Sequence, residues 1–167
     1  VRDRGLSFQA RIVGEGPLRS RLQAQAESLG LRAPLLVLDH ARSEMSEVYR
    51  EHDLLVLCSD HEGTPNVVME ALASGLAVIA TPVGDVPALI DHPEIGVVTP
   101  DLTMAALADA ISSLIGDLER VSKLGAAARR SAVDRLSPAA LLPDHLARMY
   151  LRVLGQADPN LPSLAAS

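Results

Sequence analysis

Two glutamates, Glu62 and Glu70, stand eight positions apart in the segment SDHEGTPNVVMEALASGLAVIA, residues 59–80. Glu70 is set among apolar residues, where a short hydrophobic helix has little reason to carry a charge. An ionised carboxylate only accepts hydrogen bonds, so a pair of them suits a ligand that is rich in hydroxyl groups. The question is whether the elements around this segment bring the two carboxylates to one site.

The residues around them predict a helix of about ten residues, three turns, between two buried strands. Thr64 is expected to be its N-cap, Pro65 fits the first helical position, and Gly75 lies just past the last turn. A right-handed crossover brings the ends of both strands to the carboxyl edge of the sheet, where open α/β sheets bind ligands. Glu62 is placed in the loop at this edge, directly before the helix.

The same helix carries a narrow polar stripe. Asn66, Glu70 and Ser74 recur every four residues on a helix that is otherwise apolar. The first N–H groups, those of Asn66, Val67 and Val68, lie at the positive end of the helix dipole and are expected to be free to hold an anion. A single glutamate is more often a surface charge, but two carboxylates beside anion-binding amides favour a ligand with both hydroxyls and phosphates. A nucleotide sugar has both.

Composition narrows the class of protein. The 167 residues are one domain's worth, and 48% of them are hydrophobic but only 2% aromatic, which leaves the core to Leu, Val, Ile and Ala. A net charge of −6 argues against a nucleic-acid partner, and the single cysteine, Cys58, fits a reducing compartment. No apolar run reaches about 18 residues and no signal-peptide pattern opens the chain. We therefore expect a cytoplasmic protein, and because the chain begins at Val1 we expect a piece of a larger one.

Short apolar segments alternate with helical patterns, which is typical of a parallel sheet in an α/β fold. Strands are expected in residues 8–14, 34–40, 53–59, 76–84 and 96–100. A first helix is expected from Pro17 to Gly30, with an apolar face formed by Leu18, Leu22, Ala26 and Leu29. A second is expected from Ser43, its N-cap, to Glu51. The region from Asp101 to Gly155 is expected to be helical, with interruptions at Gly116, Gly125 and Pro138. We predict a Rossmann-like parallel sheet of about five strands flanked by helices over residues 1–155, and a flexible tail over residues 156–167.

The run EGTPNVVMEALASGLAVIATPVGDVP resembles the E-x7-E region of retaining glycosyltransferases of the GT-B fold, most closely those of family 4. That family's usual run reads E-G-[FT]-P-N-x-x-x-E-A-x-A-x-G-x-P-V-[IV]-A-T-x-x-G. The segments ARIVGEGPLRSRL, DLLVLCS and IGVVTPDLTMAALADAI match the family's neighbouring elements, so the resemblance covers most of the chain. It implies the C-terminal half of a GT-B hexosyltransferase, which binds a nucleotide-diphosphate sugar and transfers the sugar with retention, without a metal or other cofactor.

Carried over residue by residue, the resemblance gives Glu62 the catalytic position, where it would bind hydroxyls of the donor sugar. Glu70 would accept hydrogen bonds from both ribose hydroxyls. The remaining substrate-binding residues are expected to be Gly63, Thr64, Asn66 and Val67 at the sugar or the distal phosphate, Leu38 and His40 at the nucleobase, and Gly14 and Gly84 at the cleft.

The sequence departs from the family's pattern in three ways. Asp39 stands where the family often has Gly, and Ala88 stands where it usually has Glu. The strand and loop with an Arg and a Lys that grip the diphosphate have no counterpart here, and neither does the acceptor-binding N-terminal domain. We therefore expect the chain alone to bind donors poorly and to be inactive, and we expect that N-terminal domain to be its partner.

Two other functions stay open at this point. A nucleotide-sugar 2-epimerase shares the fold and a similar donor site, but it would release free sugar without an acceptor. A non-catalytic α/β signalling module is the second alternative, although RIVGEGP and VVTPD lack the paired acids and the Lys of a receiver domain.

The last expected helix and the family's acceptors each suggest a further partner. Residues 139–154 place Leu142, Leu146, Met149 and Val153 on one apolar face, which could bury against a second copy and give a homodimer. A peripheral contact with the inner face of the membrane is a further expectation, because many relatives of the family use lipid-linked acceptors.

Overall fold

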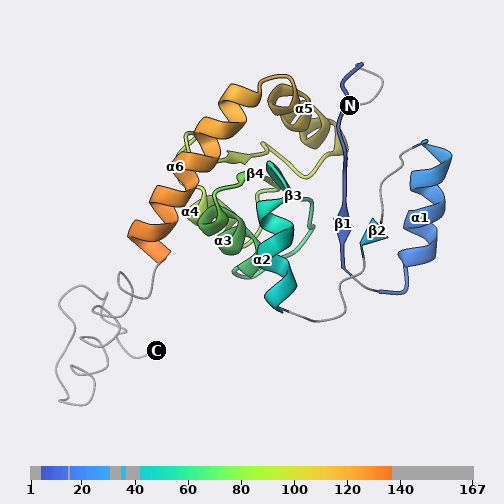
Figure 1. The fold of residues 1–167 in the computed structure, drawn as a ribbon, viewed down its shortest axis with the longest axis horizontal. Helices are drawn as coiled ribbons and strands as arrows, with labels where there is room; N and C mark the ends of the chain where they lie inside the picture. Colours follow the sequence, from blue (N-terminus) through green and yellow to red (C-terminus); the bar gives the residue numbers. More distant parts are fainter. Residues whose placement is uncertain (1–4, 15, 31–34, 37–41, 137–167) are drawn as a thin grey trace, which may run out of the picture.

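The computed structural model describes residues 5–14, 16–30, 35–36 and 42–136 of the 167 (Figure 1). In chain order the elements are β1 (Ile12–Val13), α1 (Arg19–Ser28), β2 (Leu35–Leu36), α2 (Arg42–Arg50), β3 (Leu54–Leu57), α3 (Asn66–Ser74), β4 (Ala77–Ala80), α4 (Val86–Leu89), β5 (Val97–Val98), α5 (Met104–Ile115) and α6 (Leu118–Leu136). The predicted helix at 139–154, the tail at 156–167, and Leu38 and His40 lie outside the described residues, and the domain limit at residue 155 stays a prediction.

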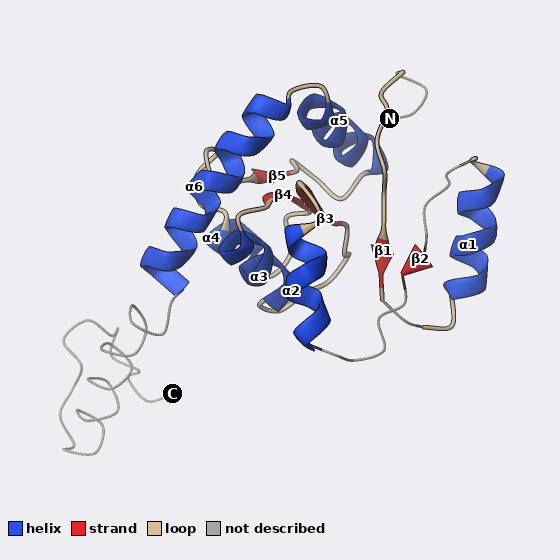
Figure 2. Ribbon diagram, viewed as in Figure 1, coloured by secondary structure: helices blue, strands red, loops and turns tan. Residues whose placement is uncertain are grey.

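The described strands are all parallel. β4 lies between β3 and β5, with Leu54 opposite Ala77 and Ile79 opposite Val97, while β1 and β2 pair separately. Figure 2 shows these strands in red with helices around them. A parallel sheet flanked by helices is thus confirmed, but the described strands form two sheets of two and three strands instead of one sheet of five.

The core is built on both faces of β4, because successive side chains of a strand point to opposite faces. Val78 and Ala80 belong to a cluster with α3, α4 and part of α6: Val68, Ala71, Leu72, Val86, Leu89, Ala128 and Ala132. Ala77 and Ile79 belong to a second cluster with α5 and the first half of α6: Leu107, Leu114, Val121 and Leu124. All four residues of β4 are fully buried, which is why this strand reads as continuously apolar.

The end of α3 is fixed by Gly75, as the sequence predicts. Gly75 adopts φ +81, and the N–H groups of Gly75 and Leu76 donate to the carbonyls of Leu72 and Ala71 at 3.1 and 3.0 Å. The prediction that Gly125 interrupts the last helical region is wrong, because α6 runs through it. A Cβ at Gly125 would lie 2.1 Å from the carbonyl oxygen of Gly75, so this glycine lets α6 pass close to the end of α3. Gly116 does end α5, as predicted.

The N-terminal unit, formed by β1, α1 and β2, differs from the rest. The apolar face predicted for α1 is largely exposed: Leu18 by 56%, Leu22 by 38% and Leu29 by 57%, and none of the helix's residues is buried. The prediction of Ser43 as an N-cap is also wrong, because α2 already begins at Arg42. No helix among the described residues is long and apolar enough to cross a membrane.

Candidate functional site

Glu62 lies in the loop after β3, where hydrogen bonds from the residue that follows β4 hold the backbone. The buried Thr81, directly after β4, donates from its N–H to the carbonyl of Leu57 at 3.1 Å and from its hydroxyl to the carbonyl of Ser59 at 2.7 Å. Ser59 in turn donates from its hydroxyl to Oε1 of Glu62 at 2.7 Å. The hydrogen bond to Oε1 therefore orients the half-buried Glu62 carboxylate, while Oε2 makes no hydrogen bond within the described residues.

The turn after β4 clamps the same loop from the other side. The N–H of Asp85 donates to the carbonyl of Gly63 at 2.9 Å, and the hydroxyl of Thr64 donates to Oδ2 of Asp85. Gly84 adopts φ +51, and a Cβ there would lie 2.1 Å from the carbonyl oxygen of Gly63 and 2.5 Å from that of Glu62. The loop that carries Glu62 thus needs a glycine at position 84 because two backbones meet there.

The N-terminus of α3 differs from the prediction in two respects. Thr64 does not cap the helix, because its hydroxyl binds Asp85; the N-cap is Pro65, in an extended conformation. The amide of Val68 is not free either, since it donates to the carbonyl of Pro65 at 3.1 Å. The amides of Asn66 and Val67 have no partner within the described part of the chain. Two N–H groups, not three, are left to hold an anion at this positive helix end.

Glu70 lies one turn further along the same helix, on the face of Asn66. Both side chains are exposed and Ser74 is half-buried, so the predicted polar stripe reaches solvent. Oε2 of Glu70 accepts a hydrogen bond from the hydroxyl of Tyr49 at 2.8 Å. Tyr49 belongs to α2 and is only 5% exposed. Burial raises the pKa of Tyr49 well above its usual range, and the hydrogen bond to Glu70 and the negative charge of that carboxylate raise it further.

The structure brings together only some of the predicted site residues. Glu62, Gly63, Thr64, Asn66, Val67 and Glu70 occupy one loop and the helix that follows it, and Gly84 packs directly against that loop. Gly14 belongs to the N-terminal unit, where it is exposed and a Cβ would meet nothing within 4 Å. Sequence reasoning missed Tyr49 and Asp85, and no local signal marked them, because both act through partners 21 residues away.

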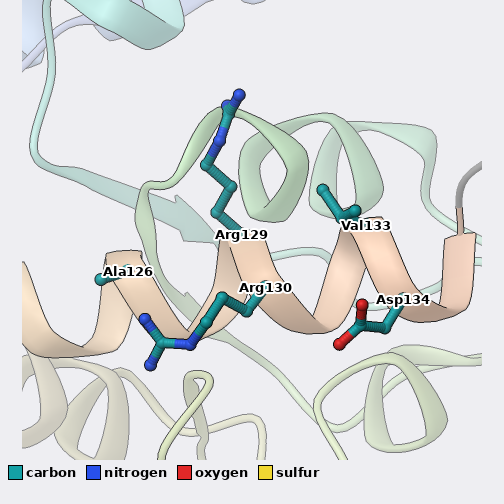
Figure 3. A pocket seen from close by; sticks show the side chains of 5 residues that line it. All are labelled: Ala126, Arg129, Arg130, Val133 and Asp134. Carbon is teal, nitrogen blue, oxygen red and sulfur yellow. The ribbon is translucent and has the colours of Figure 1, made fainter.

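A shallow hollow on α6 is unrelated to this site. Its lining residues all come from that one helix: Ala126, Arg129, Arg130, Val133 and Asp134 (Figure 3). Arg129 donates to the carbonyl of Ala73 at 2.9 Å, near the end of α3 opposite to Asn66. Arg135 likewise donates to the carbonyl of Ala88 at 2.9 Å, just before the end of α4. These arginines bind carbonyls at helix C-termini, where a positive charge is favoured.

Comparison with known proteins adds a family. A model described as glycosyl transferases group 1 matches residues 1–117. An exopolysaccharide phosphotransferase of Streptomyces coelicolor is 37% identical over 112 residues, which are 66% of this chain and 12% of that protein. A GDP-mannose-dependent alpha-mannosyltransferase of Mycobacterium tuberculosis is 36% identical over 148 residues, which are 87% of this chain and 36% of that protein.

A solved structure shares the fold. The structure of Anabaena HepE in complex with UDP superposes with a TM-score of 0.76 at 22% identity, covering 86% of this chain and 41% of that one. The chain therefore spans well under half the length of each of these three proteins.

Proposed function

Because the chain belongs to the glycosyl transferases of group 1, we propose that it forms the donor-binding part of an enzyme that transfers a sugar from a nucleotide-diphosphate sugar to an acceptor. The observation that carries this proposal is the arrangement around the start of α3. An oriented carboxylate, two amides without a partner among the described residues and a second carboxylate follow one another along one loop and one helix face. A relative that depends on GDP-mannose and a structural neighbour in complex with UDP support a nucleotide-bound donor.

Each group has a role that its chemistry supports. Glu70 would accept hydrogen bonds from the ribose hydroxyls, and the amides of Asn66 and Val67 would donate to the distal phosphate. As the sugar leaves, negative charge builds on the diphosphate, and preorganised N–H groups at the positive end of α3 stabilise it. Glu62, with Oε1 already bound by Ser59, has Oε2 to accept a hydroxyl of the sugar. We propose retention at the transferred carbon and no metal in this step.

The acceptor site is proposed to lie in a part of the protein outside this chain, since the chain spans only 36% of the mannosyltransferase and 41% of HepE. A cytoplasmic location belongs to the same proposal. Pairing of two copies depends on the region after residue 136, and contact with a membrane surface depends on a lipid-linked acceptor; both stay predictions.

The test measures how two variants bind two kinds of ligand, a nucleoside diphosphate and its sugar conjugate. It uses the whole protein that contains this chain. Glu70→Ala removes the charged acceptor of two hydrogen bonds that the ribose hydroxyls donate, so binding of UDP or GDP should weaken by roughly 2–3 kcal/mol, about 30- to 150-fold. Glu62→Ala should leave binding of the diphosphate nearly unchanged, weaken binding of its sugar conjugate and abolish transfer. Isothermal titration with UDP, GDP and their sugar conjugates measures the affinities, and release of the nucleotide from the conjugate in the presence of an acceptor measures transfer.

Glu119→Ala is the matched control, because Glu119 is an exposed glutamate on α6 whose only ion pair among the described residues is with Lys123. It should change neither affinity, and it should melt as the wild type does. All three variants should stay folded at the titration temperature, although Glu70→Ala should melt lower because it removes the partner of the buried Tyr49 hydroxyl. If Glu70→Ala binds the diphosphates as well as the wild type, Glu70 is a surface charge and the donor site is refuted. Nucleoside monophosphate as product would indicate phosphotransfer, and free sugar released without an acceptor would indicate an epimerase.

A further inference from the structure

A buried hydroxyl supports the exposed carboxylate of the proposed site. Tyr49 is 5% exposed, yet its hydroxyl meets a residue of the surface, Oε2 of Glu70, at 2.8 Å. The contact joins two helices, α2 and α3, across 21 residues of sequence. The ring of Tyr49 packs in the core cluster that contains Val68, Ala71 and Leu72 of α3, so its hydroxyl has a fixed place.

The contact restricts one side of the carboxylate only. Oε1 of Glu70 has no hydrogen-bond partner within the described residues, and Oε2 keeps a second lone pair. A glutamate on a helix surface otherwise samples several rotamers, and a ligand that binds it must first order them. Immobilising such a side chain in advance is expected to improve affinity by about 2- to 10-fold.

The hydroxyl also remains a donor over a wide pH range. A tyrosine ordinarily keeps its phenolic proton at neutral and mildly alkaline pH, and burial raises the pKa of Tyr49 further, so this hydroxyl keeps its proton there as well. At these pH values Tyr49 therefore donates to the carboxylate and does not compete with it as an anion.

We propose that Tyr49 is a positioning residue of the donor site, which holds the Glu70 carboxylate ready for the two ribose hydroxyls and so sharpens the preference for ribonucleotides. This inference depends on the proposed function, in which Glu70 binds the ribose. It predicts that the contribution of Tyr49 to binding disappears when the ligand has no ribose hydroxyls. A merely structural tyrosine would affect both kinds of ligand alike.

The experiment uses Tyr49→Phe, which keeps the ring and removes only the hydroxyl. Wild type and variant are titrated with whichever of UDP, GDP and ADP binds most tightly, and with its 2′,3′-dideoxy form. We expect Tyr49→Phe to weaken binding of the ribonucleotide by about 2- to 10-fold and to leave binding of the dideoxy form unchanged. Equal weakening of both ligands, or no weakening of the ribonucleotide, would overturn the proposal.

Two further variants separate the possible failures. Thr99→Val removes another buried hydroxyl, one that donates to the carbonyl of Asp101 at 2.7 Å, and it should change neither affinity. Glu70→Ala is measured alongside. If it loses affinity for the ribonucleotide while Tyr49→Phe does not, the role of Tyr49 is wrong and the donor site stands. All titrations use the whole protein that contains this chain. If neither variant loses affinity there, or if no nucleoside diphosphate binds the wild type, the proposed function itself is contradicted.

Discussion

The N-terminal unit and the region from β3 to α6 have the same sequence pattern, but their apolar side chains are buried to different extents. In both, short apolar strands alternate with helices. Leu72 and Leu114 are 1% and 0% exposed, whereas Ile12 of β1 is 44% exposed and Leu29 after α1 is 57% exposed. β4 has a strand on each side and helices over both faces, while β1 pairs only with β2 among the described strands. An apolar pattern thus predicts the element, but burial also requires a partner for each face.

The residues of the proposed donor site come from both of these regions. Glu62, Glu70 and the start of α3 belong to the closely packed region, where hydrogen bonds and a backbone contact at Gly84 fix their positions. Gly14 belongs to the exposed N-terminal unit, and the predicted base contacts, Leu38 and His40, lie outside the described residues. The residues proposed to contact ribose, phosphate and sugar therefore all lie in the closely packed region.

The largest effect that would test this comparison comes from truncating one leucine in each region. Leu72→Ala removes a fully buried side chain from α3, and the cavity should lower the free energy of unfolding by about 2–5 kcal/mol. Leu22→Ala on α1 should change it by less than about 0.5 kcal/mol, because that side chain is partly exposed and no residue of α1 is buried. Chemical denaturation of both variants measures the contrast. Equal losses would mean that α1 is packed in solution and that the two regions do not differ.

A smaller effect on stability tests the close approach of α6 to the end of α3. Gly125→Ala puts a Cβ 2.1 Å from the carbonyl oxygen of Gly75, so α6 and α3 must move apart, and we expect a loss of about 1–3 kcal/mol despite the better helix propensity of alanine. Gly116→Ala is the control, because its nearest neighbour would be the carbonyl oxygen of Ser112 at an ordinary 3.6 Å. Thermal unfolding distinguishes them. Should Gly125→Ala be as stable as wild type, the close passage of the two helices is not a constraint.

Sequence reasoning succeeded where the signal is local. The strands β3 and β4 are continuous apolar runs, and the end of α3 follows from a glycine that must adopt positive φ. It failed where a distant residue decides. Thr64 has the local preference of an N-cap, but Asp85 takes its hydroxyl. Gly125 was expected to interrupt a helix, whereas its actual role is to admit another backbone. The support of Glu70 by Tyr49 is of this second kind.

The central claim is that a nucleoside diphosphate binds at the start of α3. NMR spectra of the ¹⁵N-labelled protein, recorded during titration with UDP and with GDP, test it most directly. We expect saturable shifts of the amide signals of Gly63, Asn66, Val67 and Glu70 with at least one of the two ligands, and no shift for Ala126 in the hollow on α6 (Figure 3). Saturable shifts centred on Ala126, or no change at Asn66 and Val67 with either ligand, would contradict the account.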